Sequence, residues 1–461
     1  MKYIDEMKIN SLLKLKVTEK EVDEIIVKAK QLKRLSLEES AKLLMVKDDI
    51  VLQKIYESAS YVKRTIYGNR VVIFVPLYIS NLCSNSCVYC GFASNNKVTV
   101  RKKLTFQEIK QQTEILLGRG HKRILMVAGE MGSSEENINY YIGAVKAIYS
   151  AEYKCNKIKR VNINVAPMSV EHFKKLRDIG IGTYQIFQET YHEQTYRKLH
   201  VAGAKTDPDN RLNGVDNAFK AGIDDVGIGP LLGLYDPNFE ILAMLMHIEH
   251  LEKTYGVGPH TISIPRIEPA PGSDYASKPD YLVKDEEFKK IVSVLRLSVP
   301  YTGIIVSTRE TAKFRDILIN LGVSQISAES KVTPGGYEEN SVHNDKLERQ
   351  FSINDQRSLN EVVKALIVKG FIPSFCAACY RKNRTGKRFM DLAKPGQIKR
   401  ICDINALVTF KEFLKDFADA DVKELGCKLI EKHKITLDNK SVNILEKFFK
   451  DIDNGIRDKY V

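Results

Sequence analysis

The sequence lacks a long apolar segment. No stretch approaches the roughly 18 to 20 uninterrupted apolar residues that a membrane-spanning helix needs. The first segment, Met1–Lys16, alternates charged residues with short apolar pairs, and it lacks the apolar block and the cleavage site of a secretion signal. We therefore expect a cytoplasmic protein that has no membrane partner.

Cysteine is scarce, and its distribution excludes a disulfide scaffold. The 461 residues include eight cysteines, of which six fall into two groups. In a reducing compartment, grouped thiols favour metal binding over disulfides. Cys155 and Cys427 stand alone, and we interpret both as structural or incidental.

The charge is unbalanced but not concentrated. A formal net charge of +13 is compatible with a nucleic-acid partner. Lysine is nevertheless interleaved with glutamate, as in Thr18–Lys33 and Asp285–Lys290. We therefore interpret the charge as a solvated basic surface and expect no nucleic-acid partner.

The pattern of apolar residues predicts an α/β protein. Residues 1–70 predict helices, because Thr18 with Glu21 and Ser36 with Glu39 fit capping boxes. Apolar, strand-like runs then alternate with helical segments, and these runs are Val71–Tyr78, Ile124–Ala128, Val161–Val165, Thr183–Phe187, Asp225–Gly229, Thr261–Pro265, Gly303–Ser307 and Gln325–Ala328.

Eight strands over about 260 residues match the size of a closed (β/α)₈ barrel of the TIM type. An open, doubly wound sheet is the alternative, but repeated units with short connections close more naturally. We therefore predict N-terminal helices (1–70), a barrel (71–336) and a helical, cluster-binding C-terminal extension (337–461).

The first cysteine group predicts an iron–sulfur cluster. Cys83, Cys87 and Cys90 are spaced four and then three residues apart, directly after the first predicted strand. This position places three thiolates on one loop at the C-terminal face, where barrel enzymes carry their chemistry. Three soft ligands suit a cluster with one open iron. Structural zinc would need a fourth ligand, and no other Cys or His lies nearby in the sequence.

This C-x₃-C-x₂-C spacing, with Tyr89 before the last cysteine, resembles the radical S-adenosylmethionine (SAM) superfamily. The resemblance implies a [4Fe–4S] cluster that binds SAM and an electron donor such as ferredoxin or flavodoxin. Reductive cleavage of SAM would give methionine and a 5′-deoxyadenosyl radical. The same resemblance implies a set of cofactor-binding residues, namely Tyr89, Phe92, Gly129, Glu130 and Glu189. The alternative for both glutamates is an exposed loop acid or a helix cap, but their position just past predicted strands favours function.

The second group comprises Cys376, Cys379 and, after 22 intervening residues, Cys402. Alone, this pattern is compatible with a zinc site or a redox pair. A zinc ribbon would need a second close pair, which Cys402 does not provide. Three thiolates again suit a cluster with one unusual iron.

Together, the two groups resemble the tyrosine lyase of [FeFe]-hydrogenase maturation and, more distantly, the thiamine-pathway 2-iminoacetate synthase. Other stretches that carry the resemblance are Tyr67–Arg70, Gly182–Tyr184, Gly222–Gly227, Gly256–Ser263, Ser307–Glu310, Pro334–Tyr337 and Arg384–Met390. The resemblance implies that the Cα–Cβ bond of tyrosine is cleaved to p-cresol and dehydroglycine. This fragment would become CO and cyanide bound to iron for H-cluster assembly, with hydrogenase maturation proteins as partners.

The resemblance also implies roles for single residues. A second, auxiliary [4Fe–4S] cluster on Cys376, Cys379 and Cys402 would carry an extra iron, bridged by a free cysteine and ligated by His260. The alternative for His260 is a hydrogen-bonded histidine at the start of a strand. The catalytic residues would be the first three cysteines together with Ser307 and Arg309, which would hold the carboxylate of the amino acid.

Four stretches depart from the family pattern and leave other functions open. Gly91–Ala93 lacks a basic residue that the family often has, and Glu329 replaces a usual glycine. The segments Ala166–Met168 and Glu268–Pro271 also differ. One alternative is a paralogous lyase that cleaves another amino acid, and another is a 2-iminoacetate synthase, although the latter enzymes lack the C-terminal cysteine motif. A zinc-bearing nucleic-acid-binding protein would need aromatic stacking platforms, whereas the aromatic residues lie mostly in apolar runs.

Overall fold

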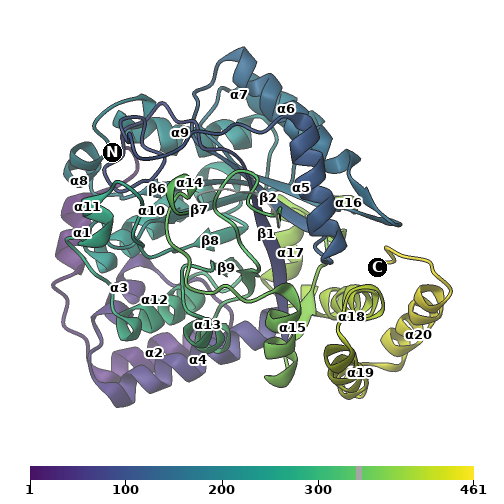
Figure 1. The fold of residues 1–461 in the computed structure, drawn as a ribbon. Coiled ribbons are helices and arrows are strands. Elements are labelled where there is room, and N and C mark those ends of the chain that lie inside the picture. The colour runs from purple at the N-terminus through teal and green to yellow at the C-terminus, as the bar shows by residue number, and fades with distance from the viewer. Residues whose placement is uncertain (339–344) are drawn as a thin grey trace.

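Eight parallel strands close into a barrel in the computed structural model, which describes residues 1–338 and 345–461 (Figure 1). Residues 339–344, which are part of the predicted extension, lie outside the described residues. The barrel strands are β1 (Arg70–Ser80), β2 (Arg123–Ala128), β5 (Arg160–Asn164), β6 (Tyr184–Glu189), β7 (Val226–Pro230), β8 (Thr261–Ser263), β9 (Gly303–Val306) and β10 (Gln325–Ser327). Pairing of β10 with β1 closes the ring. The predicted (β/α)₈ barrel is confirmed, and each strand coincides with one of the eight predicted runs.

The strands form where the sequence is apolar because both faces are covered. All eleven residues of β1 are buried, as expected for a strand with side chains inside the barrel and against the outer helices. The outer helices are α5 (Phe106–Gly118), α6 (Glu135–Ser150), α7 (Val170–Asp178), α8 (Glu193–Leu199), α9 (Pro208–Lys220), α10 (Pro237–Tyr255), α11 (Asp274–Ser277), α12 (Asp285–Ser298) and α13 (Ala312–Leu321), with a short 3₁₀ turn at Ala204–Thr206.

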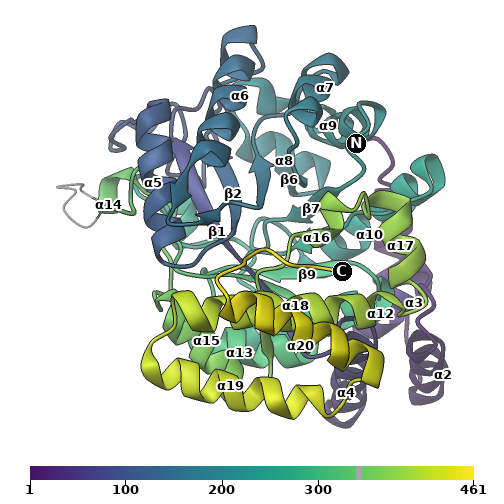
Figure 2. The ribbon, with the colours of Figure 1, turned by 90° about the vertical axis from the view of Figure 1, so that its right-hand side faces the viewer.

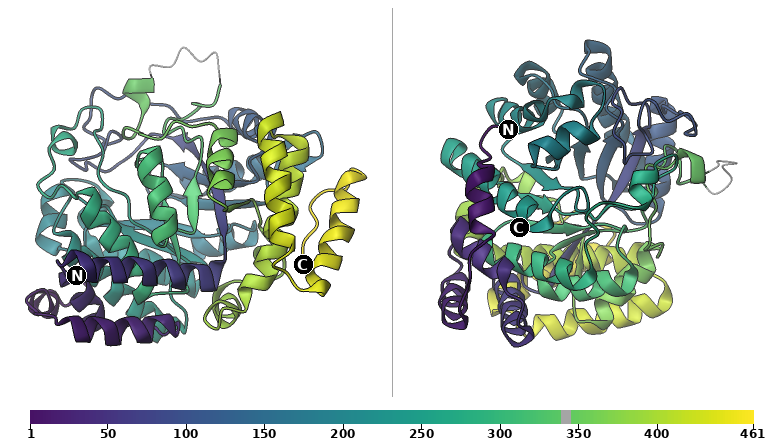
Figure 3. Two further views of the ribbon diagram at one scale, coloured as in Figure 1. Left: turned by 90° about the horizontal axis from the view of Figure 1, so that it is seen from below. Right: turned by 90° about the vertical axis from the view of Figure 1, so that its left-hand side faces the viewer.

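Four helices precede the barrel and pack along its outside (Figures 1 and 3). They are α1 (Glu6–Leu12), α2 (Glu19–Lys30), α3 (Leu37–Met45) and α4 (Asp49–Tyr67). The predicted capping boxes at Thr18 and Ser36 begin α2 and α3. Helix α4 packs against α12 and then leads directly into β1, so it fixes where the barrel begins.

From Leu359 onward, the C-terminal part is mainly helical and docks beside the start of β1 (Figure 2). Its helices are α15 (Leu359–Val368), α16 (Ala378–Arg381), α17 (Gly386–Ala393), α18 (Ile398–Asp416), α19 (Ala420–Lys434) and α20 (Asn439–Asp453), and the short helix α14 (Asp345–Glu348) lies apart from them. A buried ion pair between Lys122, which directly precedes β2, and Glu412 of α18 joins the barrel to the C-terminal helices. The division of the chain at residues 70 and 336 stays a prediction.

Three short strands were not predicted. Strand β11 (Ile372–Ser374) adds to β1 outside the barrel, and β3 (Glu152–Tyr153) pairs with β4 (Asn156–Lys157). The three residues of β11 include Pro373, so no local pattern marks them as a strand, and its place beside β1 follows from tertiary docking. Across the described ranges, no helix combines the length and apolarity needed to cross a bilayer.

Candidate active site

The first cysteine group lies on the loop that follows β1. Asn81 anchors this loop, since its side chain donates to the Val100 carbonyl at 2.7 Å and accepts from the Lys102 N–H at 2.6 Å. On its other side, the loop bonds to the segment after α8, where the Ser86 N–H donates to the Ala202 carbonyl at 3.0 Å. Gly203 there has a φ of 89°, and a Cβ at this position would collide with Asn85. The loop is therefore clamped from both sides.

All three thiols of this loop line one cavity of about 1400 Å³ at the C-terminal ends of the strands. Backbone N–H groups of Asn85 and Phe92 donate to the sulfurs of Cys83 and Cys90 at 3.5 and 3.4 Å. Burial raises the pKa of each thiol, that of Cys90 to about 11. The thiols are therefore protonated without metal, and a bound cation would be needed to make them thiolates.

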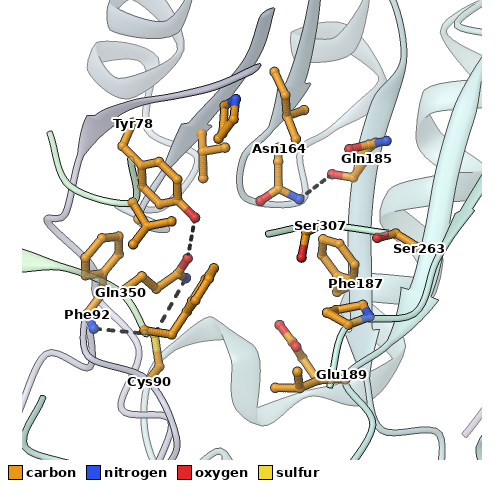
Figure 4. Close-up of a pocket in the computed structure, with 18 of the residues that line it drawn as sticks. Tyr78, Cys90, Phe92, Asn164, Gln185, Phe187, Glu189, Ser263, Ser307 and Gln350 are labelled. Atoms are coloured by element: carbon orange, nitrogen blue, oxygen red, sulfur yellow. Dashed lines mark hydrogen bonds between the residues drawn. The ribbon is translucent and has the colours of Figure 1, made fainter. Parts of the chain in front are cut away.

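The cavity also collects every other residue that we predicted for the first site, namely Tyr89, Phe92, Gly129, Glu130, Glu189, Ser307 and Arg309. Gly129 leaves no room for a side chain, because a Cβ would collide with the Leu82 carbonyl. Tyr89 donates or accepts at the His200 ring, 2.8 Å away, and Phe92 packs edge-on against Tyr78. Figure 4 shows Glu189 and Ser307 directed into the same space as Cys90.

A network of charges covers one wall of the cavity. Arg211 donates to Glu130 at 2.5 Å, and Lys205 donates to Glu189 at 2.6 Å. Asn85 adds a bond of 2.9 Å to Glu130. Burial alone would raise the pKa of Glu130, but Arg211 and Lys205 hold it below its ordinary value. Both carboxylates therefore lie in a strongly cationic setting next to the cysteines.

The sequence analysis missed Lys205, Arg211 and Asn85. Asn85 lies between Cys83 and Cys87, and this position within the cysteine motif could have indicated a role at the site. Lys205 and Arg211 are two basic residues among many, and they follow β6 by more than a dozen residues. The available signal was their position in the segment after β6, because residues that follow the C-terminal end of a barrel strand often lie near the active site.

The opposite wall carries Arg309, directly beyond β9. Its Nη1 donates to the Arg266 carbonyl at 3.3 Å, and the guanidinium lies 3.3 Å from the centre of the Phe351 ring. Burial lowers the pKa of Arg309, although a guanidinium remains charged. Most of its donors therefore remain available for an anionic ligand in the cavity.

Of the stretches that depart from the family pattern, two contribute to the lining of this cavity in the described structure, through Phe92 and Glu268. Glu329 points elsewhere and pairs with Arg119 at 3.0 Å and His121 at 3.2 Å. Its φ of 53° lies in the left-handed region, which explains why glycine suits this position in relatives.

The second cysteine group lines another cavity, of about 600 Å³, at the opposite end of the barrel. Cys376, Cys379, Cys402 and His260 all face it, together with residues from the starts of four barrel strands, namely Arg70, Arg123, Gly303 and Gln325. The carbonyl of Cys376 accepts from Arg123 at 2.6 Å, which ties the cysteine segment to β2. The four residues that we predicted for a second metal site are thus brought together.

Buried arginine side chains line this second cavity, and they favour the neutral form of the His260 imidazole. Burial and the nearby arginines lower the pKa of His260, and burial raises the pKa of Cys402 to about 12. His260 Nδ1 is buried without a hydrogen bond, 3.8 Å from Asp225. Arg70 Nε is also buried without a partner.

Within the described ranges, no group of three or more His, Cys, Asp or Glu side chains gathers tightly enough to hold a single metal ion. The cysteines of each group instead surround a cavity. Thiols spread around a space suit a multi-iron cluster better than one zinc ion, for which four ligands converge on a point.

Comparisons with known proteins agree with this geometry. The model of the Radical SAM superfamily matches residues 77–248, and that of the Biotin and Thiamin Synthesis associated domain matches residues 263–372. The 2-iminoacetate synthase of Escherichia coli strain K12 is 32% identical over 324 residues, which cover 70% of this chain and 82% of that enzyme. The chain belongs to the radical SAM superfamily.

Solved radical SAM structures are similar along the whole chain. A crystal structure of HydG, a maturase of the [FeFe]-hydrogenase, has 46% sequence identity and a TM-score of 0.96, and the match covers 100% of both chains. HydG from Carboxydothermus hydrogenoformans has 40% identity and a TM-score of 0.81, with 93% of this chain and 94% of that chain covered. Membership of the radical SAM superfamily implies a [4Fe–4S] cluster and SAM, and the three-thiol loop beside a charged cavity fits both.

Proposed function

We propose that this radical SAM protein is a tyrosine lyase that produces iron-bound CO and cyanide for the assembly of the hydrogenase H-cluster. The observation that carries the proposal is the second cavity, where Cys376, Cys379, Cys402 and His260 meet. A lyase that only released its amino-acid fragment would need the first cavity alone. The likeness to two HydG structures over nearly the whole chain supports a role in the maturation of [FeFe]-hydrogenase.

In the first cavity, the cluster and SAM supply the radical chemistry when bound. Cys83, Cys87 and Cys90 would hold the cluster. Glu130 and Glu189, each fixed by a cation, would orient the cofactor. Tyr89 and Phe92 would pack around it, and Gly129 would let it approach the backbone.

Ser307 and Arg309 would hold the amino acid on the opposite wall. A guanidinium fork binds a carboxylate through two parallel hydrogen bonds, which fixes direction as well as position. Glu130 follows β2, Glu189 ends β6 and Arg309 follows β9, and all three residues line a single cavity. This arrangement would keep substrate and cofactor in register and limit the water around them.

In the second cavity, Cys376, Cys379 and Cys402 would hold an auxiliary cluster. His260 is neutral at physiological pH because its pKa is lowered by burial, so it would be suited to ligate an extra iron next to this cluster. The buried charge of Arg70 would offset the negative charge of the thiolates. We further propose that the protein works in the cytoplasm with ferredoxin or flavodoxin as electron donor and with hydrogenase maturation proteins as recipients.

The experiment separates the two cavities. Anaerobically reconstituted protein is incubated with reductant, SAM and L-tyrosine, and p-cresol, 5′-deoxyadenosine, CO and cyanide are measured. The double variant Cys376→Ala/Cys379→Ala should keep 5′-deoxyadenosine and p-cresol but lose CO, because the first cavity lies at the other end of the barrel. The matched control Cys155→Ala/Cys427→Ala removes two exposed cysteines outside both cavities and should retain all products.

Two results would contradict the proposal. Loss of all SAM cleavage in a correctly folded Cys376→Ala/Cys379→Ala variant would show that the two sites do not work separately. Absence of p-cresol from tyrosine, with turnover of another amino acid, would favour the paralogous lyase, and Glu268 would then be the first residue to test in the substrate wall.

A further inference from the structure

A short segment crosses the mouth of the first cavity. This strap, Arg349–Asp355, reaches the cysteine loop and the loops after β8 and β9. The Gly91 N–H donates to the Gln350 carbonyl at 3.1 Å, and the Ser352 N–H donates to the Pro269 carbonyl at 2.8 Å. The Asn354 N–H donates to the Thr308 carbonyl at 2.9 Å. The strap is therefore held by its backbone at three points around the cavity.

The contact with the cysteine loop is close. A Cβ on Gly91 would lie 2.7 Å from the Arg349 carbonyl oxygen and 2.8 Å from that of Gln350. These distances are shorter than the van der Waals contact between a carbon and an oxygen atom. Only glycine therefore fits at position 91 while the strap passes this close to the cysteine loop. The close contact sets the position of Gln350 relative to the cluster loop.

The side chain of Gln350 reaches the sulfur of Cys90. Its amide oxygen accepts from the Tyr78 hydroxyl at 2.8 Å, and its amide Nε2 donates to Cys90 Sγ at 3.8 Å (Figure 4). In this arrangement the amide oxygen is the acceptor of the Tyr78 hydroxyl, which leaves Nε2 facing the sulfur. In the described structure, Cys90 is the one thiol of the first group to which a side-chain amide donates.

We propose that Gln350 is a positioning residue for the first cluster, and that its N–H···S bond to Cys90 raises the reduction potential of that cluster. Reduction adds an electron and hence negative charge to the cluster and its thiolates. A hydrogen bond to sulfur stabilises the more negative, reduced state more than the oxidised state. The inference rests on the cluster of the radical SAM superfamily and not on the choice of substrate, so it stands or falls separately from tyrosine cleavage.

The test is a redox titration of the reconstituted holoenzyme, followed by electron paramagnetic resonance. The signal of the first cluster is recognised because addition of SAM changes it. In Gln350→Leu, the ratio of reduced to oxidised cluster at a fixed potential should fall about tenfold, which equals a shift of about 59 mV to lower potential. Tyr78→Phe should cause a smaller shift in the same direction, since it releases the amide without removing it.

The controls separate this role from a structural one. Ser352→Ala changes a side chain of the same strap but keeps the backbone bond to Pro269, so the potential should be unchanged. Combining Tyr78→Phe with Gln350→Leu should add no shift to that of Gln350→Leu alone. An unchanged potential in Gln350→Leu with full iron content would overturn the proposal. If that variant fails to assemble its cluster, an unchanged potential in Tyr78→Phe would overturn it equally.

Discussion

Replacement of Arg309 by lysine tests how the first cavity binds its substrate. The guanidinium of Arg309 makes one long hydrogen bond, to the Arg266 carbonyl, among the described residues, and Phe351 supports the guanidinium plane. The fork is thus held in place while most of its donors stay free. Lysine retains the charge but offers a single ammonium in place of two parallel donors.

The magnitude follows from the loss of one charge-assisted bond. A hydrogen bond to a charged group contributes about 1.5 to 3 kcal/mol. If Arg309→Lys loses one of two such bonds to the carboxylate, the apparent KM for tyrosine should rise roughly tenfold to 150-fold. SAM cleavage without substrate should persist, because Arg309 lies on the wall opposite Glu130 and Glu189.

The assay measures p-cresol over a range of tyrosine concentrations and 5′-deoxyadenosine with and without tyrosine. Arg197→Lys is the matched control, since Arg197 is exposed and pairs with Glu193 on α8. This control should leave both measurements unchanged. An unchanged apparent KM in Arg309→Lys would refute the reasoning and exclude a carboxylate clamp at this residue.

Three further predictions concern the cluster loop and two buried ionisable groups. Alanine at Cys83, Cys87 or Cys90 should abolish 5′-deoxyadenosine formation, and retained turnover in any single variant would contradict the shared cluster. Burial raises the pKa of Glu240 to about 8 from 4.5, so the folded state loses stability as pH rises toward 8. Glu240→Gln should remove this loss of folding free energy, which is about 5 kcal/mol at most. The thermal midpoint of the variant should exceed that of the unmodified protein at pH 8 but not at pH 5, and equal gains at both pH values would contradict the reasoning. Burial lowers the pKa of Lys63 to about 7, and its Nζ has no hydrogen bond, so the charged form is penalised in the folded state. Lys63→Met should therefore raise the thermal midpoint at pH 6 more than at pH 10, and equal gains would contradict this reasoning.

The sequence by itself determined the barrel and the position of the first cysteine group. Strands β1, β2 and β9 are largely apolar runs, as expected for strands that are buried on both faces. The other barrel strands are shorter or include polar residues, but they recur at similar spacing between helical segments. Cys83, Cys87 and Cys90 lie within eight residues of one another, so their spacing alone places three thiols on one loop. Glu130 and Glu189 could be predicted for a similar reason, because parallel strands end at one face of the barrel.

Only the tertiary structure decided which distant residues join these local elements. Gln350 reaches Cys90, and Arg123 holds the Cys376 segment, although some 250 residues separate each pair along the chain. Strand β11 is too short to show a period of its own, yet its pairing with β1 places the second cysteine group beside the starts of the barrel strands. Contacts of this kind depend on how whole elements dock, and docking is set by the shape and burial of surfaces made by many segments. A local pattern of residues carries no record of such surfaces, which is why the two cysteine groups could be predicted singly and their placement at opposite ends of one barrel could not.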